Sequence, residues 1–410
     1  MNNKKNNDIS LYLSIIVILN IIPIGVMNLL TKKSIALPQS IILIIFVIQT
    51  GLLFSYFIRT KIVVNKNYFI LFILYITITL IYCMIQYINN SMEIQDIYNL
   101  ITKFITVSTL IIFIEQLSID EEKLIKFLKI ILIIAIVACV YNMIYYSTEI
   151  LSIAKLSSSY DVNIKSFFSN RNQFAQFLFV AIVADSMLME TDKSWKYKIY
   201  FIFILLNMIF TMSRTALMIT AIFLIINFII KQNTKKNLVK SILLLIILLC
   251  ISLLLYNKYS NIINSLFIRS DNIENASGRT GIWETGIDIV LNNNIIMGVG
   301  RFTGIKILNN RGYDFTQFHS IYIEALVNGG ILELLLLILV LGILMKRLLK
   351  SNMPIGYKKK WIVTIICFGI LGIFESINRF SIGYVDTMYT VFFITIPLLF
   401  TNSYIKDKEK

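Results

Sequence analysis

The sequence has little of what many soluble enzymes use for catalysis. Its 410 residues include one histidine, four cysteines and four prolines, and only 15% of them are charged. It contains no GxxxxGKS/T loop for nucleotide phosphates, no HExxH or CxxC pattern, and no DxD pattern for a metal-bound nucleotide sugar. These absences argue against ATP or sugar-nucleotide chemistry on the cytoplasmic side. Any donor substrate should therefore already be linked to a lipid.

The four cysteines give no sign of a disulfide framework or a metal site. They all fall inside apolar runs and none has a close partner in the sequence, at positions Cys83, Cys139, Cys250 and Cys367. Buried cysteine behaves as a small apolar residue. We therefore expect all four to be packing residues, and we expect no metal and no cofactor.

Apolar residues are what the sequence has in abundance. They make up 57% of the chain, and the mean hydropathy is +0.77. A soluble domain is nearer half apolar and a quarter charged, whereas a membrane span takes about 20 mostly apolar residues. This composition excludes a soluble enzyme, a disordered protein and a single-pass receptor. It predicts an all-α polytopic membrane protein.

Apolar runs separated by polar breaks predict about 12 transmembrane helices in one integral membrane domain, residues 1–410. The run at 9–30 is too long for a signal-peptide core and has no cleavage site, so we interpret it as a retained first span. The predicted spans are 9–30, 35–58, 67–88, 97–117, 125–146, 173–190, 199–213, 215–230, 241–255, 321–345, 361–378 and 384–401.

The net charge of +15 fits this topology without a nucleic-acid partner. Membrane proteins concentrate Lys and Arg in cytoplasmic loops. Placing both termini in the cytoplasm puts most of these residues on the cytoplasmic side, including the cluster Lys358 to Lys360. The sequence thus predicts a multi-pass protein of the bacterial cytoplasmic membrane.

Residues 199–230 form a continuous apolar stretch that is interrupted only by Thr211, Ser213, Arg214 and Thr215. A single helix of this length would extend about 48 Å, which is too long for a hydrocarbon core of about 30 Å. We therefore predict a tight helical hairpin. Arg214 then lies recessed near its tip, where an arginine is costly unless it meets an anion or a wet cavity.

Two substantial loops are predicted on the outer face, at residues 147–172 and 256–320. The second loop is the large one, and it joins the predicted ninth and tenth spans. Within it, residues 278–290 place Ile282, Gly286, Ile289 and Val290 on one side at helical spacing, with Trp283 beside them. This pattern predicts an amphipathic helix lying at the membrane interface.

The single histidine, His319, lies where the large outer loop enters the tenth span. Histidine is the usual general base near neutral pH, although a loop histidine can equally be bonded to water or backbone.

Several arginines share the outer face with His319. Converging guanidinium groups suit a lipid-linked diphosphate, because each binds phosphate in a bidentate manner and stays charged. Each arginine alone could instead pair with a lipid headgroup or with a nearby carboxylate such as Asp271, Glu274, Glu284 or Asp314. Arg214 and Arg279 fit that alternative least, the first because it is recessed and the second because it begins the Trp283 helix. The outer-face arginines are Arg171, Arg214, Arg269, Arg279, Arg301, Arg311 and Arg379.

Carboxylates within predicted spans offer a different chemistry. Glu333 falls near the middle of the bilayer, and Glu375 lies near the outer end of the eleventh span, one turn from Arg379. A transporter would use such groups as ion relays, whereas an enzyme would use them to orient arginines. No helix carries a ladder of Asp or Glu, so we favour structural pairing for these groups and for Lys103 and Asp185.

Four ordered stretches between residues 164 and 400 resemble the O-antigen polymerase and ligase superfamily, the Wzy-type membrane glycosyltransferases. They are SNRNQFAQF (169–177), TMSRTALM (211–218), GRTGIWETGIDIVLNNNIIMGVGRF (278–302) and HSIYIEALVNGGI (319–331). Two departures occur: Ser320 follows the histidine where the family often has Asn, and Met297 precedes the Gly-x-Gly where it often has Pro. Neither removes an expected catalytic group.

The resemblance implies a GT-C-like membrane enzyme that transfers a growing glycan from undecaprenyl diphosphate onto an acceptor sugar hydroxyl, inverting the anomeric carbon without metal or nucleotide. Arg214 and Arg279 would hold the diphosphate, and His319 would orient or deprotonate the hydroxyl. Membrane lipids, a flippase and a chain-length regulator are the implied partners. The expected substrate-binding residues are Arg171, Arg301, Trp283, Glu375 and Arg379.

Two alternatives to a polymerase of capsule, exopolysaccharide or O-antigen units remain open. One is a ligase of the same fold that delivers a finished glycan to a lipid or protein acceptor. The other is a transporter of lipid-linked oligosaccharide or of a small solute. Transporters often carry inverted repeats with matched Gly or Pro breaks, and this sequence shows neither.

Overall fold

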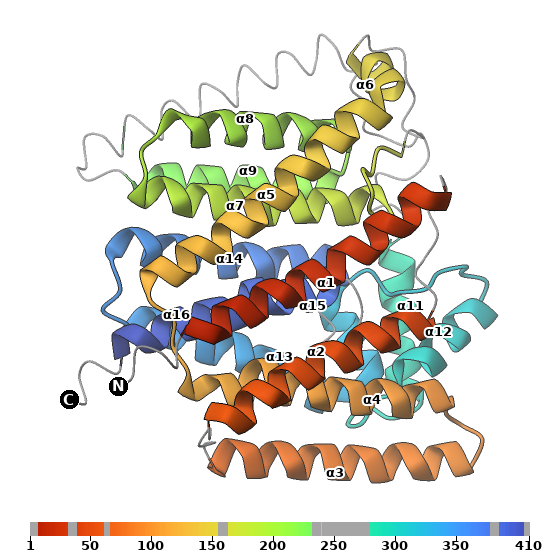
Figure 1. Ribbon diagram of the computed structural model, residues 1–410. Helices are drawn as coiled ribbons and strands as arrows, with labels where there is room; N and C mark the ends of the chain where they lie inside the picture. Colours follow the sequence, from red (N-terminus) through yellow and green to blue (C-terminus); the bar gives the residue numbers. More distant parts are fainter. Residues whose placement is uncertain are drawn as a thin grey trace.

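The computed structural model describes residues 7–31, 39–60, 66–154, 163–231, 239, 279–377 and 385–405. Within these residues the regular structure is entirely helical, so the predicted all-α class is confirmed. The start of α1 and the end of α16 lie on the same side, at the left of Figure 1, while α6, α11 and α12 lie at the right.

The helices follow the predicted spans closely. In the first half of the chain they are α1 (Asn7–Thr31), α2 (Gln39–Thr60), α3 (Lys66–Ile88), α4 (Ile94–Val107), the short turns η1 (Ser108–Ile112) and η2 (Phe113–Gln116), α5 (Glu121–Tyr145) and α6 (Ser147–Ala154). In the second half they are α7 (Arg171–Thr191), α8 (Trp195–Phe210), α9 (Arg214–Ile230), α11 (Arg279–Asn292), α12 (Arg301–Asn310), α13 (Ile321–Lys350), α14 (Ile355–Phe374), α15 (Val385–Thr390), η4 (Val391–Thr395) and α16 (Ile396–Ile405).

Six of the described helical segments are long and apolar enough to cross a membrane: Ser40–Thr60, Phe69–Ile88, Glu121–Tyr145, Arg171–Thr191, Ile321–Lys350 and Thr387–Ile405. Two shorter apolar segments, Ile9–Pro23 and Arg214–Ile230, accompany them. The predicted ninth span, 241–255, lies outside the described residues, and the total of twelve stays a prediction.

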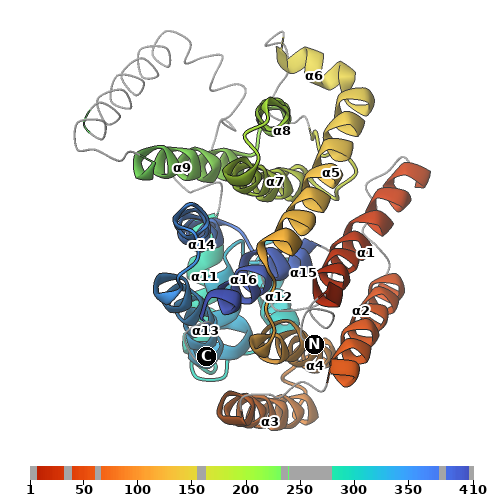
Figure 2. The same ribbon diagram turned by 60° about the vertical axis from the view of Figure 1, so that its left-hand side comes forward.

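The helices form three groups (Figure 2). One contains α7, α8 and α9, with α5 running down beside them; a central one contains α11, α13, α14, α15 and α16; and α1 to α4 lie along the outside. Burial follows this arrangement, since 78% of the apolar window in α7 is buried but only 17% of that in α3. A span with so many uncovered apolar side chains suits lipid contact. The packing core therefore surrounds α7, α14 and the final helices.

The polar break within residues 199–230 separates two helices, as predicted. Helix α8 ends at Phe210 and α9 begins at Arg214, with Met212 in the left-handed region at φ 55°. The two helices are not an antiparallel pair, however. In Figure 2 α8 is seen nearly end-on while α9 runs across the view, and α9 packs instead on α14 and α7.

Helix α13 is broken near its middle by a pair of glycines. Gly329 and Gly330 leave helical geometry, and Gly330 has a φ of 67°. The break frees backbone groups, which must find partners where water is scarce. Residues 295–300 supply them: Val299 N–H donates to Val327 O at 2.9 Å, and Ile331 N–H donates to Ile295 O at 2.9 Å. The Gly-x-Gly stretch is thus docked into the gap in α13.

A buried ion pair lies beside this break. Lys103 Nζ of α4 lies 2.6 Å from Glu333 Oε2 of α13, with side chains only 2% and 8% exposed. The Asn328 amide donates to both oxygens of the same carboxylate. Lys103 and Glu333 are therefore paired, as expected, and the structural role favoured for the pair stays a prediction.

The interfacial placement predicted for residues 278–290 is wrong in one respect. The helix exists as α11, but Ile282 and Ile289 are completely buried, and the cluster around them includes Phe318 and Val327. Gly286 approaches so closely that a Cβ there would lie 2.7 Å from the side chain of Ile323. Protein therefore covers the apolar side that the hydrophobic pattern assigned to lipid.

Candidate functional site

Four of the described helices begin with one of the predicted arginines. Arg171, Arg214, Arg279 and Arg301 are the first residues of α7, α9, α11 and α12. The first turn of a helix carries unpaired N–H groups and a partial positive charge, and a guanidinium at the same place adds a full one. This position makes each helix start suited to an anion.

The starts of α7 and α9 are joined by the two short motifs found in the sequence. Asn170 caps α7 by accepting from Gln173 N–H at 2.9 Å. The next asparagine, Asn172, accepts from Ser213 Oγ at 3.0 Å across the gap to α9. Since Asn172 follows Arg171 and Ser213 precedes Arg214, this bond holds the two arginine-bearing helix ends together.

Glu375 links these two helices to a third. Its Oε1 accepts from Arg279 Nη2 at 3.0 Å, and the polar side chains of Thr215 of α9 and Gln176 of α7 lie beside the same carboxylate. The side chain is only 5% exposed. One buried carboxylate therefore lies among the starts of α7, α9 and α11.

Glu375 and Arg279 form a largely buried pair of opposite charge. The guanidinium favours the ionised form of the carboxylate. Arginine remains charged at any accessible pH. Glu375 thus acts as a buried counter-ion that positions Arg279, whose Nη1 also donates to the carbonyl of Phe374.

Trp283 connects this arginine region to the entry of α13. Its Nε1 donates to Phe318 O at 3.0 Å, and its ring lies 6.2 Å from that of Phe374. Phe318 directly precedes His319, and Phe374 directly precedes Glu375. The indole therefore holds the backbone at His319 close to the segment that binds Arg279.

His319 has an unusual backbone and a defined ring contact. Its φ is 53°, a left-handed value that few residues other than glycine adopt. The Nδ1 atom lies 3.1 Å from Nε2 of Gln317, and the ring meets Phe315 edge-on at 5.8 Å. A left-handed residue stays in place only when its surroundings fix it, and such residues concentrate at functional sites.

A second buried carboxylate, Glu324, supports the same turn. Its Oε1 accepts from Phe318 N–H at 2.9 Å and from Ser376 Oγ at 3.0 Å. Its Oε2 lies 3.6 Å from Arg301 Nε. Glu324 thus joins the histidine turn, the residue after Glu375 and the start of α12.

Helix α12 also has a cap that comes from a distant part of the chain. Asp96 of α4 accepts from Phe302 N–H at 2.7 Å and from Thr303 N–H at 3.0 Å. The N-cap residue Gly300 has no side chain to do this, and a Cβ there would lie 2.4 Å from Cγ of Asp96. The second glycine of Gly-x-Gly therefore makes room for the capping carboxylate.

Seven of the eight predicted site residues fall in this connected network, and the eighth, Arg379, lies outside the described residues. Arg311 is different, because it pairs with Asp288 and is substantially exposed. Among the residues that the structure describes, no group of three His, Cys, Asp or Glu side chains could hold a metal ion.

Sequence reasoning missed the residues that position the others: Asp96, Gln176, Gln317, Glu324 and Ser376. Asp96, Gln176 and Ser376 have partners far away in the chain, so spacing could not reveal them, whereas Gln317 lies only two residues from His319. Glu324 carried a weak signal, since it lies five residues after His319 in a stretch that the resemblance already included.

Residues 199–338, about a third of the chain, match the family model described as O-antigen ligase. The match is consistent with the O-antigen polymerase and ligase superfamily, so the resemblance seen in the sequence is confirmed. It includes Arg214, Arg279, Trp283, Arg301 and His319, and it ends before Glu375. No curated protein matches the chain. The match points to a membrane protein of the O-antigen polymerase or ligase type.

Proposed function

We propose that the protein is a polysaccharide polymerase that joins undecaprenyl-diphosphate-linked repeat units on the outer face of the bacterial cytoplasmic membrane. The observation that carries this proposal is the meeting of three arginine-headed helices, α7, α9 and α11, at the buried carboxylate of Glu375. A diphosphate carries two linked anionic groups. Several guanidinium groups together with helix starts suit such a ligand better than they suit a ligand with a single carboxylate.

In this proposal Arg279 and Arg214 bind the donor diphosphate and stabilise the charge that develops when the glycosyl bond breaks. The acceptor sugar hydroxyl attacks the anomeric carbon from the opposite side, so the configuration inverts. The hydroxyl proton goes to His319, and undecaprenyl diphosphate leaves. Arg171 and Arg301 bind outer parts of the substrates, and Trp283 orients the histidine turn.

The ion pair between Arg279 and Glu375 supports the role given to Arg279. Arg279 is already paired with Glu375, so an incoming diphosphate meets a guanidinium held in position rather than a mobile one. A guanidinium that is already held in place loses little freedom when the substrate binds, and its hydrogen bonds can stabilise the transition state.

Polymerisation by the purified protein tests the proposal. A synthetic undecaprenyl diphosphate repeat unit is supplied, with EDTA in one arm, and products are resolved on a gel. We expect a ladder that EDTA leaves intact and that His319→Ala and Arg279→Ala abolish. Arg311→Ala is the matched control, because this arginine directly follows α12 but pairs with Asp288 at the surface.

A ladder undiminished in both variants would keep the activity but remove the assigned residues. The match to a family described as O-antigen ligase makes a ligase the second candidate. A single transfer to an added lipid or protein acceptor, without a ladder, would favour the ligase. Transport of the unit without any glycan product would contradict both.

A further inference from the structure

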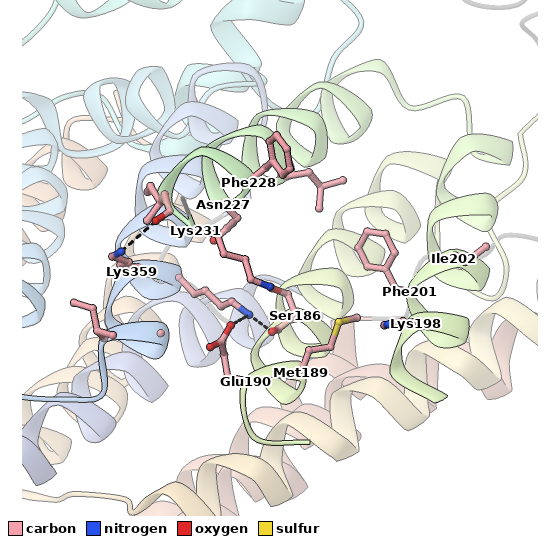
Figure 3. Close-up of a pocket in the computed structure, with 15 residues that line it drawn as sticks. Ser186, Met189, Glu190, Lys198, Phe201, Ile202, Asn227, Phe228, Lys231 and Lys359 are labelled. Atoms are coloured by element: carbon pink, nitrogen blue, oxygen red, sulfur yellow. Dashed lines mark hydrogen bonds and ion pairs between the residues drawn. The ribbon is translucent and has the colours of Figure 1, made fainter. Parts of the chain in front are cut away.

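A second site with a different chemistry lies at the opposite ends of α7 and α9. A cavity of about 560 Å³ is formed by the last turns of α7 and α9, the first turns of α8 and the beginning of α14 (Figure 3). Helix α7 has 21 residues, so this cavity lies about 30 Å from Arg171, which is one hydrocarbon thickness away.

The cavity is strongly basic. Lys198, Lys231, Lys359 and Lys360 line it, and Glu190 is the one acidic residue in its lining. Glu190 is already engaged, since its Oε1 lies 2.7 Å from Lys360 Nζ and its carboxylate contacts the first turn of α14 at Gly356. The internal carboxylate therefore balances only one of the four lysines.

Two of these lysines have structural roles and two lie at the surface. Lys360 donates to Ser186 O as well as to Glu190, and Lys359 Nζ donates to Ile230 O at 3.1 Å at the end of α9. Lys198 and Lys231 are exposed. An ammonium has three N–H donors, so Lys359 can hold the end of α9 and still donate to a ligand.

The remaining lining is apolar and opens sideways. Phe201 and Ile202 come from α8, and Leu224 and Phe228 come from α9. Ile202 is 55% exposed and Phe228 is 40% exposed. In Figure 3 Lys198 lies nearest Phe201 and Met189, and Lys231 lies near Asn227 and Phe228. The cavity thus offers cationic groups next to an apolar wall that continues onto the side of the bundle.

We propose that this cavity binds an anionic phospholipid, with the headgroup phosphate among Lys198, Lys231 and Lys359 and the first part of an acyl chain along Phe201, Ile202 and Phe228. Basic pockets between membrane helices on the cytoplasmic side recognise anionic headgroups. A small free anion would use the lysines but would leave the apolar wall without a partner. This site is separate from the proposed glycan-transfer site, and the inference does not depend on it.

Native mass spectrometry of the purified full-length protein in neutral detergent tests the inference. Phosphatidylglycerol, phosphatidylcholine or glycerol 3-phosphate is added, and the bound fraction is measured. The variant Lys198→Gln/Lys231→Gln removes the two exposed lysines and leaves Lys359 and Lys360 to hold the helices. Lys346→Gln/Lys350→Gln is the matched control, because it removes two exposed lysines from the end of α13, outside the cavity.

We expect one phosphatidylglycerol to remain on the wild-type protein and on the control, and its binding to weaken about 25-fold in the cavity variant, because each of the two removed lysines contributes about fivefold near an anionic headgroup. An excess of glycerol 3-phosphate should not displace the lipid. Equal losses in both double variants, equal retention of phosphatidylcholine, or displacement by glycerol 3-phosphate would each overturn the proposal.

A variant of the apolar wall keeps the test independent of charge. Phe228→Ser should weaken retention of phosphatidylglycerol while leaving all four lysines in place. Unchanged retention in Phe228→Ser, with circular dichroism confirming a folded protein, would contradict a lipid site.

Discussion

Arg279 and Glu375 form an ion pair, at 3.0 Å, between the first residue of α11 and the residue that follows α14. The two residues are 96 positions apart in the chain, and both side chains are largely shielded, at 15% and 5% exposed. This pair fixes where the guanidinium can lie before any substrate arrives.

Replacing Glu375 by glutamine should lower the rate of glycan transfer by about tenfold or more, because hydrogen bonds between charged groups contribute about 1.5–3 kcal/mol. The amide keeps the shape of the carboxylate but loses its attraction for Arg279. Initial rates over a range of donor concentrations would measure the effect. Glu284→Gln is the control, since Glu284 is an exposed glutamate on α11, the helix that carries Arg279. A faster rate in Glu375→Gln would mean that the carboxylate competes with the donor for Arg279.

Substitutions at Gln317 should reveal which nitrogen of His319 carries the proton. When the Gln317 amide nitrogen donates to Nδ1, the ring proton lies on Nε2, which then cannot accept a proton; a base role for His319 therefore requires the flipped amide, whose oxygen accepts from Nδ1–H and leaves Nε2 basic. A carboxylate at position 317 accepts from Nδ1–H and leaves Nε2 basic. If His319 is the base, Gln317→Glu should retain the wild-type rate and Gln317→Leu should lose several-fold.

Thr316→Glu controls for the added charge, because Thr316 is the exposed neighbour of Gln317. A rate in Gln317→Glu as low as in His319→Ala, with Thr316→Glu unaffected, would assign His319 a donor role instead.

Gly300→Ala should destabilise the protein more than Gly312→Ala does. Both glycines have a positive φ, 86° and 90°, so both substitutions carry backbone strain of about 1–3 kcal/mol. Only at Gly300 would the added Cβ meet another group, the Asp96 carboxylate, whereas nothing lies within 4 Å of it at Gly312. Thermal unfolding in detergent would compare the two. Equal losses of stability in the two variants would show that the Asp96 side chain moves aside easily and contributes little to capping α12.

Removing Lys103 alone should cost more than removing it together with the charge of Glu333. Lys103→Met leaves a buried carboxylate without its counter-ion, at a cost of about 3–5 kcal/mol. The double variant Lys103→Met/Glu333→Gln should recover much of the stability and keep glycan transfer. Lys126→Met is the control, since Lys126 also lies 2.6 Å from a glutamate but that pair is 67% and 77% exposed.

Lost transfer in a stable double variant would contradict a structural role for the pair. It would instead favour a functional ion relay through Lys103 and Glu333.

The helix positions could be predicted from the sequence because hydrophobic periodicity is a local property. Helix α3 begins one residue before the predicted span at 67 and ends with it at Ile88. Helix α14 begins at Ile355, six residues earlier than predicted, and so includes Lys358 to Lys360. Lysine is a good helix former, and its long stem can reach the aqueous edge, so polarity alone does not end a helix.

The candidate arginines could be identified because charge is rare in apolar surroundings, but their convergence could not. Whether the starts of α9 and α11 come together depends on Thr215 of α9, Gln176 of α7 and Glu375 just after α14, which are far apart in the chain. The same limit applies to α11, whose apolar side fitted lipid and protein equally well as a pattern. Only the packing of Phe318 and Val327 against it decides between the two.

The break in α13 has a consequence for how relatives of this chain could be recombined. Residues 295–300 supply hydrogen-bond partners to the backbone around Gly329 and Gly330, so the outer segment and the broken helix complete each other. A chimera that exchanges only the residues before His319 would combine residues 295–300 of one protein with the broken helix of another. A chimera should therefore keep the fold of this region only when residues 279–333 are exchanged as one segment.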